Sequence, residues 1–218
     1  MLTNFIRRVV HHGLNARYLL RCYNRLAVKQ KIAEILCNYQ KRKITDESLL
    51  PSAVLIPLFC KEGQCHVLFT ERSSEVSSHK GQVCFPGGVS QPGDSSLLHT
   101  ALRETEEEIG LKAEDVEILA ELDDSMTVST GYVISPFVAF IPYPYPFKVN
   151  HQEITEVFSV PLSFLVDRDH LKQDCQIIDS QVLTTPCYEY AGHVIWGATA
   201  RILRQFIELL RPESGTSC

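Results

Sequence analysis

Three glutamates at helical spacing are the residues of this sequence best suited to bind a metal ion. Glu104, Glu107 and Glu108 follow one another at i, i+3 and i+4, so a helix that winds about 100° per residue gathers them on one face. Like charges at this spacing destabilise a helix, and a cation among them would remove that cost. Because every ligand atom would be an oxygen, the pattern favours Mg²⁺ or Mn²⁺ over zinc. The alternative is a solvated helix surface that binds no ion.

The residues around these glutamates indicate a tight turn that leads into the helix. Gly87 and Gly88 let the backbone turn sharply and approach a ligand closely. Arg103 can orient a carboxylate through its forked guanidinium, and Gly110 suits the left-handed conformation that ends a helix. The stripe predicted to be buried on this helix consists of Leu98, Leu102, Thr105 and Ile109.

The stretch from Gly88 to Leu111 resembles the Nudix box, in which a glycine, an acidic residue, Arg-Glu, Glu-Glu and a final glycine recur at set spacing. The match is complete from Arg103 onward, but one residue more than usual separates Asp94, the first acid, from Arg103. Asp94 is therefore interpreted as a structural partner of the box. The resemblance implies a metal-dependent diphosphatase. The metal ligands that it implies, of which the glutamates also act in catalysis, are Glu104, Glu107, Glu108 and the carbonyl of Gly88.

A second resemblance narrows the branch of the family. An L-x-T-x-R-S segment at residues 68–73, followed by G-x-x-x-F-P-G-G at residues 81–88, resembles the coenzyme A diphosphatases. The chain departs from their pattern at Ser77-Ser78, where many members carry a second basic residue. The branch implies coenzyme A or acyl-CoA as substrate, whose ribose 3′-phosphate suits a forked cationic donor. The substrate-binding residues predicted on this basis are Arg72, His79, Lys80, Gly87 and Gly88.

Two landmarks after the box fit the same branch. Glu153 begins an E-I-x-x-V-F segment from which Nudix enzymes often recruit an acid, and Glu156 is its competitor. Trp196-Gly197-x-Thr199 also resembles the branch. Glu153 is predicted as a catalytic residue, and the general base is either this side chain or one of the box glutamates.

Two other functions remain open at this point. A Nudix hydrolase of another substrate, such as NADH, ADP-ribose, a dinucleoside polyphosphate or an oxidised nucleotide, would keep the same box. A Nudix-like binding domain without catalysis would be expected to lose box carboxylates, whereas all three are present in this chain.

Composition limits the classes of partner. A chain of 218 residues with 44% apolar content can bury one full core. A net charge of −5 argues against a nucleic-acid partner. The eight cysteines include no Cys-x-x-Cys pair, which favours a reducing compartment. No apolar run has the length of a membrane span, so we expect no membrane partner and either a monomer or a homodimer.

The N-terminal segment is basic and contains no acid before Glu34. This composition resembles a mitochondrial presequence and predicts a mitochondrial location. The alternative is a basic amphipathic helix that packs on the domain. The predicted division is a basic arm with a helix at residues 1–45, a Nudix domain at 46–212 and a short tail at 213–218.

The remaining pattern predicts the elements that hold these residues. Strands are expected at 53–59, 66–70, 116–122, 131–140, 176–183 and 186–190, and further helices at 28–42, 163–167 and 198–210. Pro136 suggests an edge strand or a bulge. Helices that interrupt the strands favour a mixed sheet between helices, and the family resemblance, which covers residues 52–210, implies the α/β/α sandwich of an α+β fold.

Overall fold

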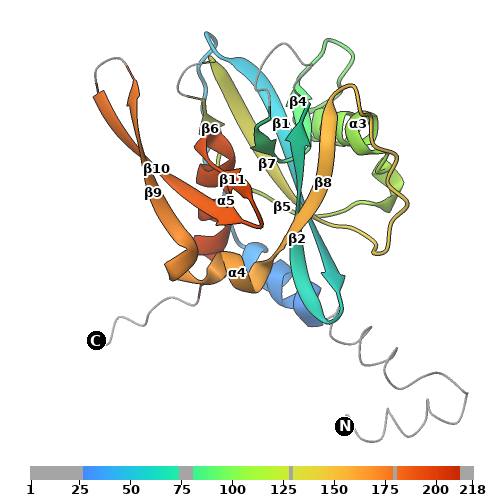
Figure 1. Ribbon diagram of the computed structural model, residues 1–218. Coiled ribbons are helices and arrows are strands. Elements are labelled where there is room, and N and C mark those ends of the chain that lie inside the picture. Colours follow the sequence, from blue (N-terminus) through green and yellow to red (C-terminus); the bar gives the residue numbers. More distant parts are fainter. Residues whose placement is uncertain (1–26, 74–80, 128–129, 179–180, 212–218) are drawn as a thin grey trace, which may run out of the picture.

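The structure is a computed structural model that describes residues 27–73, 81–127, 130–178 and 181–211. A mixed sheet forms its centre, with α3 on one side and α5 on the other, as the predicted α/β/α sandwich requires (Figure 1). A separate sheet of three strands stands beside α5. The sequence pattern did not predict this second sheet.

The central sheet has the strand order β3-β2-β1-β7-β5. In addition β4 pairs with β1, β6 with β7, and β8 with β2. The strands are β1 (Leu50–Lys61), β2 (Gln64–Arg72), β3 (Val83–Cys84), β4 (Gly87–Val89), β5 (Glu117–Glu121), β6 (Ser125–Met126), β7 (Tyr132–Phe140) and β8 (Ile154–Pro161). β1 runs parallel to β7, and the other pairings in this sheet are antiparallel.

Helices cover both faces of this sheet. The longer helices are α3 (Leu97–Ile109) and α5 (Gly197–Leu210), and a further helix spans residues 27–36. The short helices are α4 (Leu162–Val166), η1 (Ala113–Asp115) and η2 (Arg168–His170). The second sheet consists of β9 (Leu171–Ile178), β10 (Gln181–Tyr190) and β11 (His193–Ile195).

Strand β1 is buried on both faces and separates two cores. Successive side chains of a strand point to opposite faces, so Leu55 and Ile56 enter different clusters. Leu55 packs with Ala101 of α3. Ile56 belongs to the cluster that contains Phe206 of α5 and Leu36 of helix 27–36. The alternation within this strand therefore fixes which helix covers which face.

The strands predicted at 53–59 and 66–70 are confirmed, as parts of β1 and β2, which form a hairpin. β1 and β2 are joined by a two-residue loop at Glu62 and Gly63, both with positive φ, of 53° and 83°. This conformation matches the twist of the flanking strands. The helices predicted at 163–167 and 198–210 are also confirmed, within one residue at each end.

Pro136 does not mark an edge strand. β7 lies between β1 and β5, and Pro136 is opposite Val54 in the parallel ladder. Its carbonyl accepts a hydrogen bond from the Leu122 amide at 2.9 Å. The pairing with β5 ends next to Pro136, and the pairing with β6 begins beyond it. The missing N–H of this proline therefore falls where β7 changes partner.

Three other predictions of local structure need correction. The run predicted as a strand at 176–183 contains the reversal between β9 and β10, and Pro186 pairs within β10 instead of beginning a new strand. The N-terminal helix covers 27–36 instead of 28–42. On α3, Thr105 and Ile109 are buried as predicted, but Leu98 and Leu102 are half-buried and Ala101 lies at the centre of the contact. The small side chain of Ala101 lets the helix approach the sheet closely.

Candidate active site

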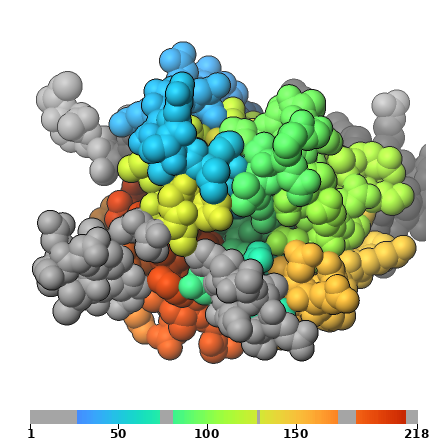
Figure 2. Space-filling model, turned by 90° about the horizontal axis from the view of Figure 1, so that it is seen from above, coloured from blue at the N-terminus to red at the C-terminus, as the bar shows by residue number. Residues whose placement is uncertain are grey.

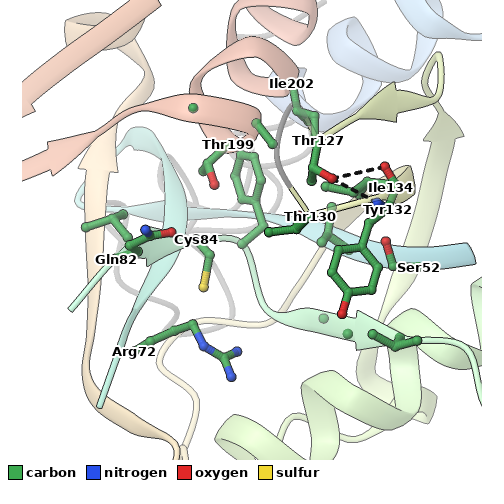
Figure 3. A pocket seen from close by; sticks show the side chains of 18 of the residues that line it. Ser52, Arg72, Gln82, Cys84, Thr127, Thr130, Tyr132, Ile134, Thr199 and Ile202 are labelled. Carbon is green, nitrogen blue, oxygen red and sulfur yellow. Dashed lines mark hydrogen bonds between the residues drawn. The ribbon is translucent and has the colours of Figure 1, made fainter. Parts of the chain in front are cut away.

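A split in the central sheet creates a cavity of about 510 Å³. β8 occupies one edge of β2 along residues 66–72, so β1 and β3 share the other edge. After Leu58, β1 pairs with β2, whereas its first residues pair with the glycine strand β4. Residues 83–89 therefore fill the split and face the cavity together with the beginning of β1 (Figure 3).

Caps at both ends define the glutamate helix α3. Ser96 is its N-cap, and the Ser96 hydroxyl accepts a hydrogen bond from the His99 amide at 3.1 Å. Gly110 ends the helix with φ 70°, and its amide donates to the Glu106 carbonyl. A Cβ on Gly110 would lie 2.8 Å from the Cβ of Lys148. Glycine at this position satisfies both the conformation and the packing.

Glu108 is the most buried carboxylate of the site, with 1% of its surface exposed. It accepts a hydrogen bond from the Gly87 amide at 3.1 Å and lies 3.5 Å from Nη1 of Arg72. Burial raises the pKa of Glu108 to about 8, and the charges of Glu104 and Glu153 add to this, whereas Gly87 and Arg72 lower it in part. At neutral pH this carboxyl is mostly protonated unless a cation takes the place of the proton.

Glu104 lies one turn earlier, against the glycine strand. Burial raises its pKa, and the ion pair with Arg103 at 2.8 Å opposes that rise. A Cβ on Gly88 would lie 2.5 Å from the Glu104 carboxylate, so glycine is required for the close approach of backbone and carboxylate. The sequence prediction that Gly88 and Glu104 belong to one site agrees with this contact.

Glu153 is the third carboxylate of the cavity. It lines the cavity with Glu104 and Glu108, and the Asn150 amide nitrogen donates to its carboxylate at 3.1 Å. Its backbone carbonyl accepts a hydrogen bond from the Ser73 amide at 2.7 Å. Three carboxylates thus share one cavity, and each of the two on α3 has a pKa raised by the other acids. This oxygen-rich, mutually repelling set fits a hard divalent cation.

Glu107 is not among the described residues that line the cavity. Its side chain is 55% exposed and pairs with Nη1 of Arg103 at 3.2 Å. Relative to Glu104, Glu108 is rotated by about 40° and Glu107 by about 60° in the opposite sense. The expectation that all three glutamates face one way is therefore correct for two of them, and the role of Glu107 as a ligand stays a prediction.

Arg103 acts as a clamp between the box and the turn before it. Its Nε and Nη2 donate to the two oxygens of Asp94 at 2.9 and 3.0 Å. Asp94 also accepts from the Thr100 hydroxyl at 2.9 Å and the Gln91 amide at 2.9 Å. The Arg103 guanidinium holds the pKa of Asp94 well below its usual range. Asp94 is therefore a structural partner of Arg103, as the extra residue between them suggested.

Arg72 lies at the carboxylate end of the cavity. Its side chain extends into the cavity next to Cys84 (Figure 3), and its Nε is buried with no hydrogen-bond partner among the described residues. Gly87 and Gly88 line the same cavity. The other two predicted substrate contacts, His79 and Lys80, lie outside the described residues.

The opposite end of the cavity consists of residues that the sequence reasoning missed. Thr130, Thr185 and Ile202 line it, from the approach to β7, from β10 and from α5. Trp196 and Thr199 line it as well. The resemblance of the Trp196-Gly197-x-Thr199 segment to the coenzyme A branch is the one sequence signal for this end of the cavity, and it assigns no role to these residues.

Among the described residues, the one group of three possible metal ligands whose ligand atoms lie close together is found beside the cavity. Glu71, Glu156 and His193 offer ligand atoms within 4.8 Å of one another, and none of them is among the described residues that line the cavity. Glu71 and Glu156 are opposite each other in the β2–β8 ladder, and His193 Nδ1 lies 3.0 Å from Glu71. Glu156, the competitor of Glu153, therefore faces β11 instead of the cavity.

Comparisons with known proteins agree with this geometry. The family model of the NUDIX domain matches residues 49–172. A protein named uncharacterized Nudix hydrolase NudL from Photorhabdus laumondii is 37% identical over 157 residues, which cover 72% of this chain and 83% of that protein. A NudL of Yersinia pestis is 37% identical over 160 residues, or 72% and 78%. The crystal structure of a MutT/nudix family protein from Enterococcus faecalis has a TM-score of 0.50 at 17% identity and covers 78% of this chain and 66% of that one. This last likeness concerns the fold alone.

These relatives contradict the predicted mitochondrial location. They are bacterial proteins, and bacteria have no mitochondria. The basic arm that suggested a presequence lies largely outside the described residues. Its described part, helix 27–36, packs Ile32 and Leu36 into the core. None of the helices in the described part of the chain is long and apolar enough to cross a membrane.

Proposed function

Because the chain belongs to the Nudix family and is a Nudix hydrolase, we propose that its substrate is coenzyme A or an acyl-CoA. Hydrolysis of the diphosphate bond would give 3′,5′-ADP and phosphopantetheine or its acyl form. The observation that carries this proposal is one cavity that joins three carboxylates to Arg72, whose buried Nε has no partner among the described residues. The segment around Arg72 is the part of the sequence that resembles the coenzyme A branch.

Nudix hydrolases generally use divalent metal ions, and we propose Mg²⁺ or Mn²⁺ here. When bound, such an ion neutralises the diphosphate and lowers the pKa of an attacking water. Glu104 and Glu108 are the proposed ligands within the cavity, with the Gly88 carbonyl beside them. Glu107 joins this set by its place in the box, and it would have to leave Arg103 to do so.

The other residues of the site bind the substrate and handle the proton. Glu153 is the proposed base, because it lines the cavity and its carboxylate is oriented by Asn150. It would accept a proton from water as the phosphorus–oxygen bond forms. The bond to the leaving phosphate breaks in the same displacement, and Arg72 would bind the ribose 3′-phosphate of coenzyme A.

The second candidate is hydrolysis of another nucleoside diphosphate derivative, such as NADH or ADP-ribose. It needs the same carboxylates and differs in the contact to the ribose. A 3′-phosphate, which coenzyme A carries, requires a cation within reach, and Arg72 is the described side chain that offers one beside the carboxylates. The intact carboxylate set also disfavours a domain that only binds its ligand.

A substrate panel tests the proposal. The purified chain is incubated with Mg²⁺ or Mn²⁺ and with coenzyme A, dephospho-CoA, NADH or ADP-ribose, and the products are identified by mass. We expect the release of 3′,5′-ADP from coenzyme A to be the fastest of these reactions. Release of AMP from NADH or ADP-ribose without turnover of coenzyme A would contradict the proposed substrate.

The Arg72→Ala variant tests the proposed contact with the 3′-phosphate. Loss of a charge-assisted contact should lower kcat/KM for coenzyme A about 10- to 100-fold, and that for dephospho-CoA much less. Arg168→Ala, at an exposed position of η2, is the matched control and should change neither. Equal losses for both substrates in Arg72→Ala would show that the 3′-phosphate is bound elsewhere.

A further inference from the structure

Three buried polar atoms without partners converge on the same cavity. Arg72 Nε, Thr130 Oγ1 and Thr185 Oγ1 have no hydrogen-bond partner among the described residues, and all three residues line the cavity. Leaving such a group unsatisfied costs about 1–3 kcal/mol. Because Thr185 is only 8% exposed, bulk water has little access to its hydroxyl. Because these atoms line the cavity, a molecule bound there can supply their missing partners.

The two ends of the cavity differ in charge. Arg72 lies at the carboxylate end, and Thr127, Thr199 and Ile202 lie at the far end beside α5 (Figure 3). That far end combines hydroxyl groups with apolar walls, and the described residues that line it include no carboxylate. Its one described cation, Arg201, donates to the Met126 carbonyl. Apart from this guanidinium, which is turned to a backbone carbonyl and stays charged, the described residues at the α5 end offer hydroxyl and apolar groups.

The hydroxyls at this end are not equivalent. The Thr127 hydroxyl already accepts a hydrogen bond from the Tyr132 amide at 2.8 Å, which holds the approach to β7 in place. Thr130 and Thr185 have no such bond, and they come from two separate elements. A ligand in the cavity can form hydrogen bonds with both hydroxyls, and Ile202 and Trp196 add apolar surface to the same lining.

We propose that the α5 end binds the uncharged arm of the substrate, an arm that bears amide or hydroxyl groups between apolar carbons. This inference rests on the proposed function, because it takes the diphosphate to lie at the carboxylates. For coenzyme A the arm is the pantetheine half, and Thr130 and Thr185 form hydrogen bonds with its amide or hydroxyl groups. The nucleotide half is directed the other way, since its 3′-phosphate requires the cation at the Arg72 end.

Most residues of the α5 end lie in a different part of the chain from the carboxylates. The NUDIX match ends at residue 172, whereas Thr185, Trp196 and Ile202 all follow it. In Figure 2 the C-terminal part of the chain adjoins the β6–β7 region, which in turn meets the beginning of β1 and the α3 region on one face. The matched domain thus supplies the carboxylates and Thr130, and the C-terminal sheet and helix supply Thr185, Trp196 and Ile202.

Thr185→Val tests the inference, with Thr184→Val as the matched control on the same strand. Thr184 is exposed, whereas Thr185 is buried in the cavity wall. Equilibrium binding of 4′-phosphopantetheine and of 3′,5′-ADP is measured by calorimetry, which requires no turnover. We expect Thr185→Val to weaken phosphopantetheine binding about 2- to 10-fold, as for one neutral hydrogen bond, and to leave 3′,5′-ADP binding unchanged. Thr130→Val should act in the same way.

Thermal unfolding separates this role from a structural one. Because the Thr185 hydroxyl has no protein partner among the described residues, its removal should keep or raise the unfolding temperature. Weaker binding of phosphopantetheine together with an unchanged or higher unfolding temperature supports the inference. Unchanged phosphopantetheine affinity in both threonine variants, absence of its binding to the wild type, or a loss of 3′,5′-ADP binding instead would overturn it. If phosphopantetheine binds as expected but coenzyme A is not hydrolysed, the inference stands and the proposed function fails.

Discussion

Glu108 combines a functional position with an unfavourable setting for a charge. Its folded-state pKa, raised to about 8 by burial, lies above the value of an unfolded chain, about 4.3. In the absence of metal ions, the folded protein therefore binds this proton more tightly than the unfolded chain does. The stability that this group contributes is fully present below the unfolded pKa and is lost as the pH rises through about 8.

The same shift predicts how metal binding depends on pH. A proton and a cation compete for the Glu108 carboxylate, so Mg²⁺ affinity should rise about tenfold per pH unit below the pKa and level off above it. Calorimetric titration of the metal-free protein between pH 6 and 9 measures this slope. Glu106→Gln, at an exposed position of the same helix, should keep the slope. An affinity that does not change between pH 6 and 8 would contradict the assignment of Glu108 as a ligand.

Gly88 tests the contact between the glycine strand and the helix. In Gly88→Ala the new Cβ would meet the Glu104 carboxylate at 2.5 Å and displace it, and a displacement of about 1 Å in such a site costs about 100-fold in rate. We therefore expect a loss of that order in kcat with little change in unfolding temperature. Gly93→Ala is the control, since its Cβ would meet nothing within 4 Å. A Gly88→Ala variant as active as Gly93→Ala would exclude the proposed arrangement.

Helix α3 is the element that carries the site, and its C-terminal stop holds it in register. Gly110 and Gly192 both have positive φ, of 70° and 91°, so alanine at either position costs about 1–2 kcal/mol through the backbone. At Gly110 the new Cβ would also clash with Lys148, whereas at Gly192 it would meet nothing within 4 Å. Denaturant unfolding should therefore show Gly110→Ala to be less stable than Gly192→Ala by about 1 kcal/mol or more. Equal stabilities would mean that the Lys148 contact is loose.

The elements that sequence predicted well are those whose signals are local. Glycine and helical periodicity marked α3 and its end at Gly110, and the residue pattern marked the strands at 53–59 and 66–70. Of the two alternatives at Pro136, the edge strand was wrong, because the missing N–H is accommodated where β7 changes partner from β5 to β6, and the β5–β7 ladder has its register shift close by. The reversal between β9 and β10 was missed because it lies within a run that alternates like a single strand.

The residues of the candidate site likewise divide into those with a local sequence signal and those without one. Glu104 and Glu108 could be predicted from spacing along one helix, and Glu153 and Arg72 from family resemblance. Thr130 and Thr185 could not, because their shared cavity arises from the packing of β10 and α5 beside β7. The exposure of Glu107 also depends on a long-range contact, since Arg103 is held by Asp94 and pairs with Glu107 from there.

At the scale of the whole molecule, helix 27–36 is part of the folded unit. Leu36 is 2% exposed within the core, whereas Ile35 on the same helix is 36% exposed. Leu36→Ala should therefore destabilise the protein by about 2–4 kcal/mol, and Ile35→Ala by about 1 kcal/mol or less. Chemical denaturation of both variants measures the difference. If the two variants lose equal stability, the helix does not contribute to the core as the packing indicates.

One comparison tests the role of the α3 carboxylates directly. Release of 3′,5′-ADP from coenzyme A is measured for the wild type and for the double variant Glu104→Gln/Glu108→Gln, with Mg²⁺ and with a chelator. We expect release by the wild type only when the metal is added, and a decrease of about 1,000-fold or more in the double variant with its folding preserved. Full activity of the folded double variant, or undiminished release by the wild type in the chelator, would contradict a metal-dependent diphosphatase built on these residues.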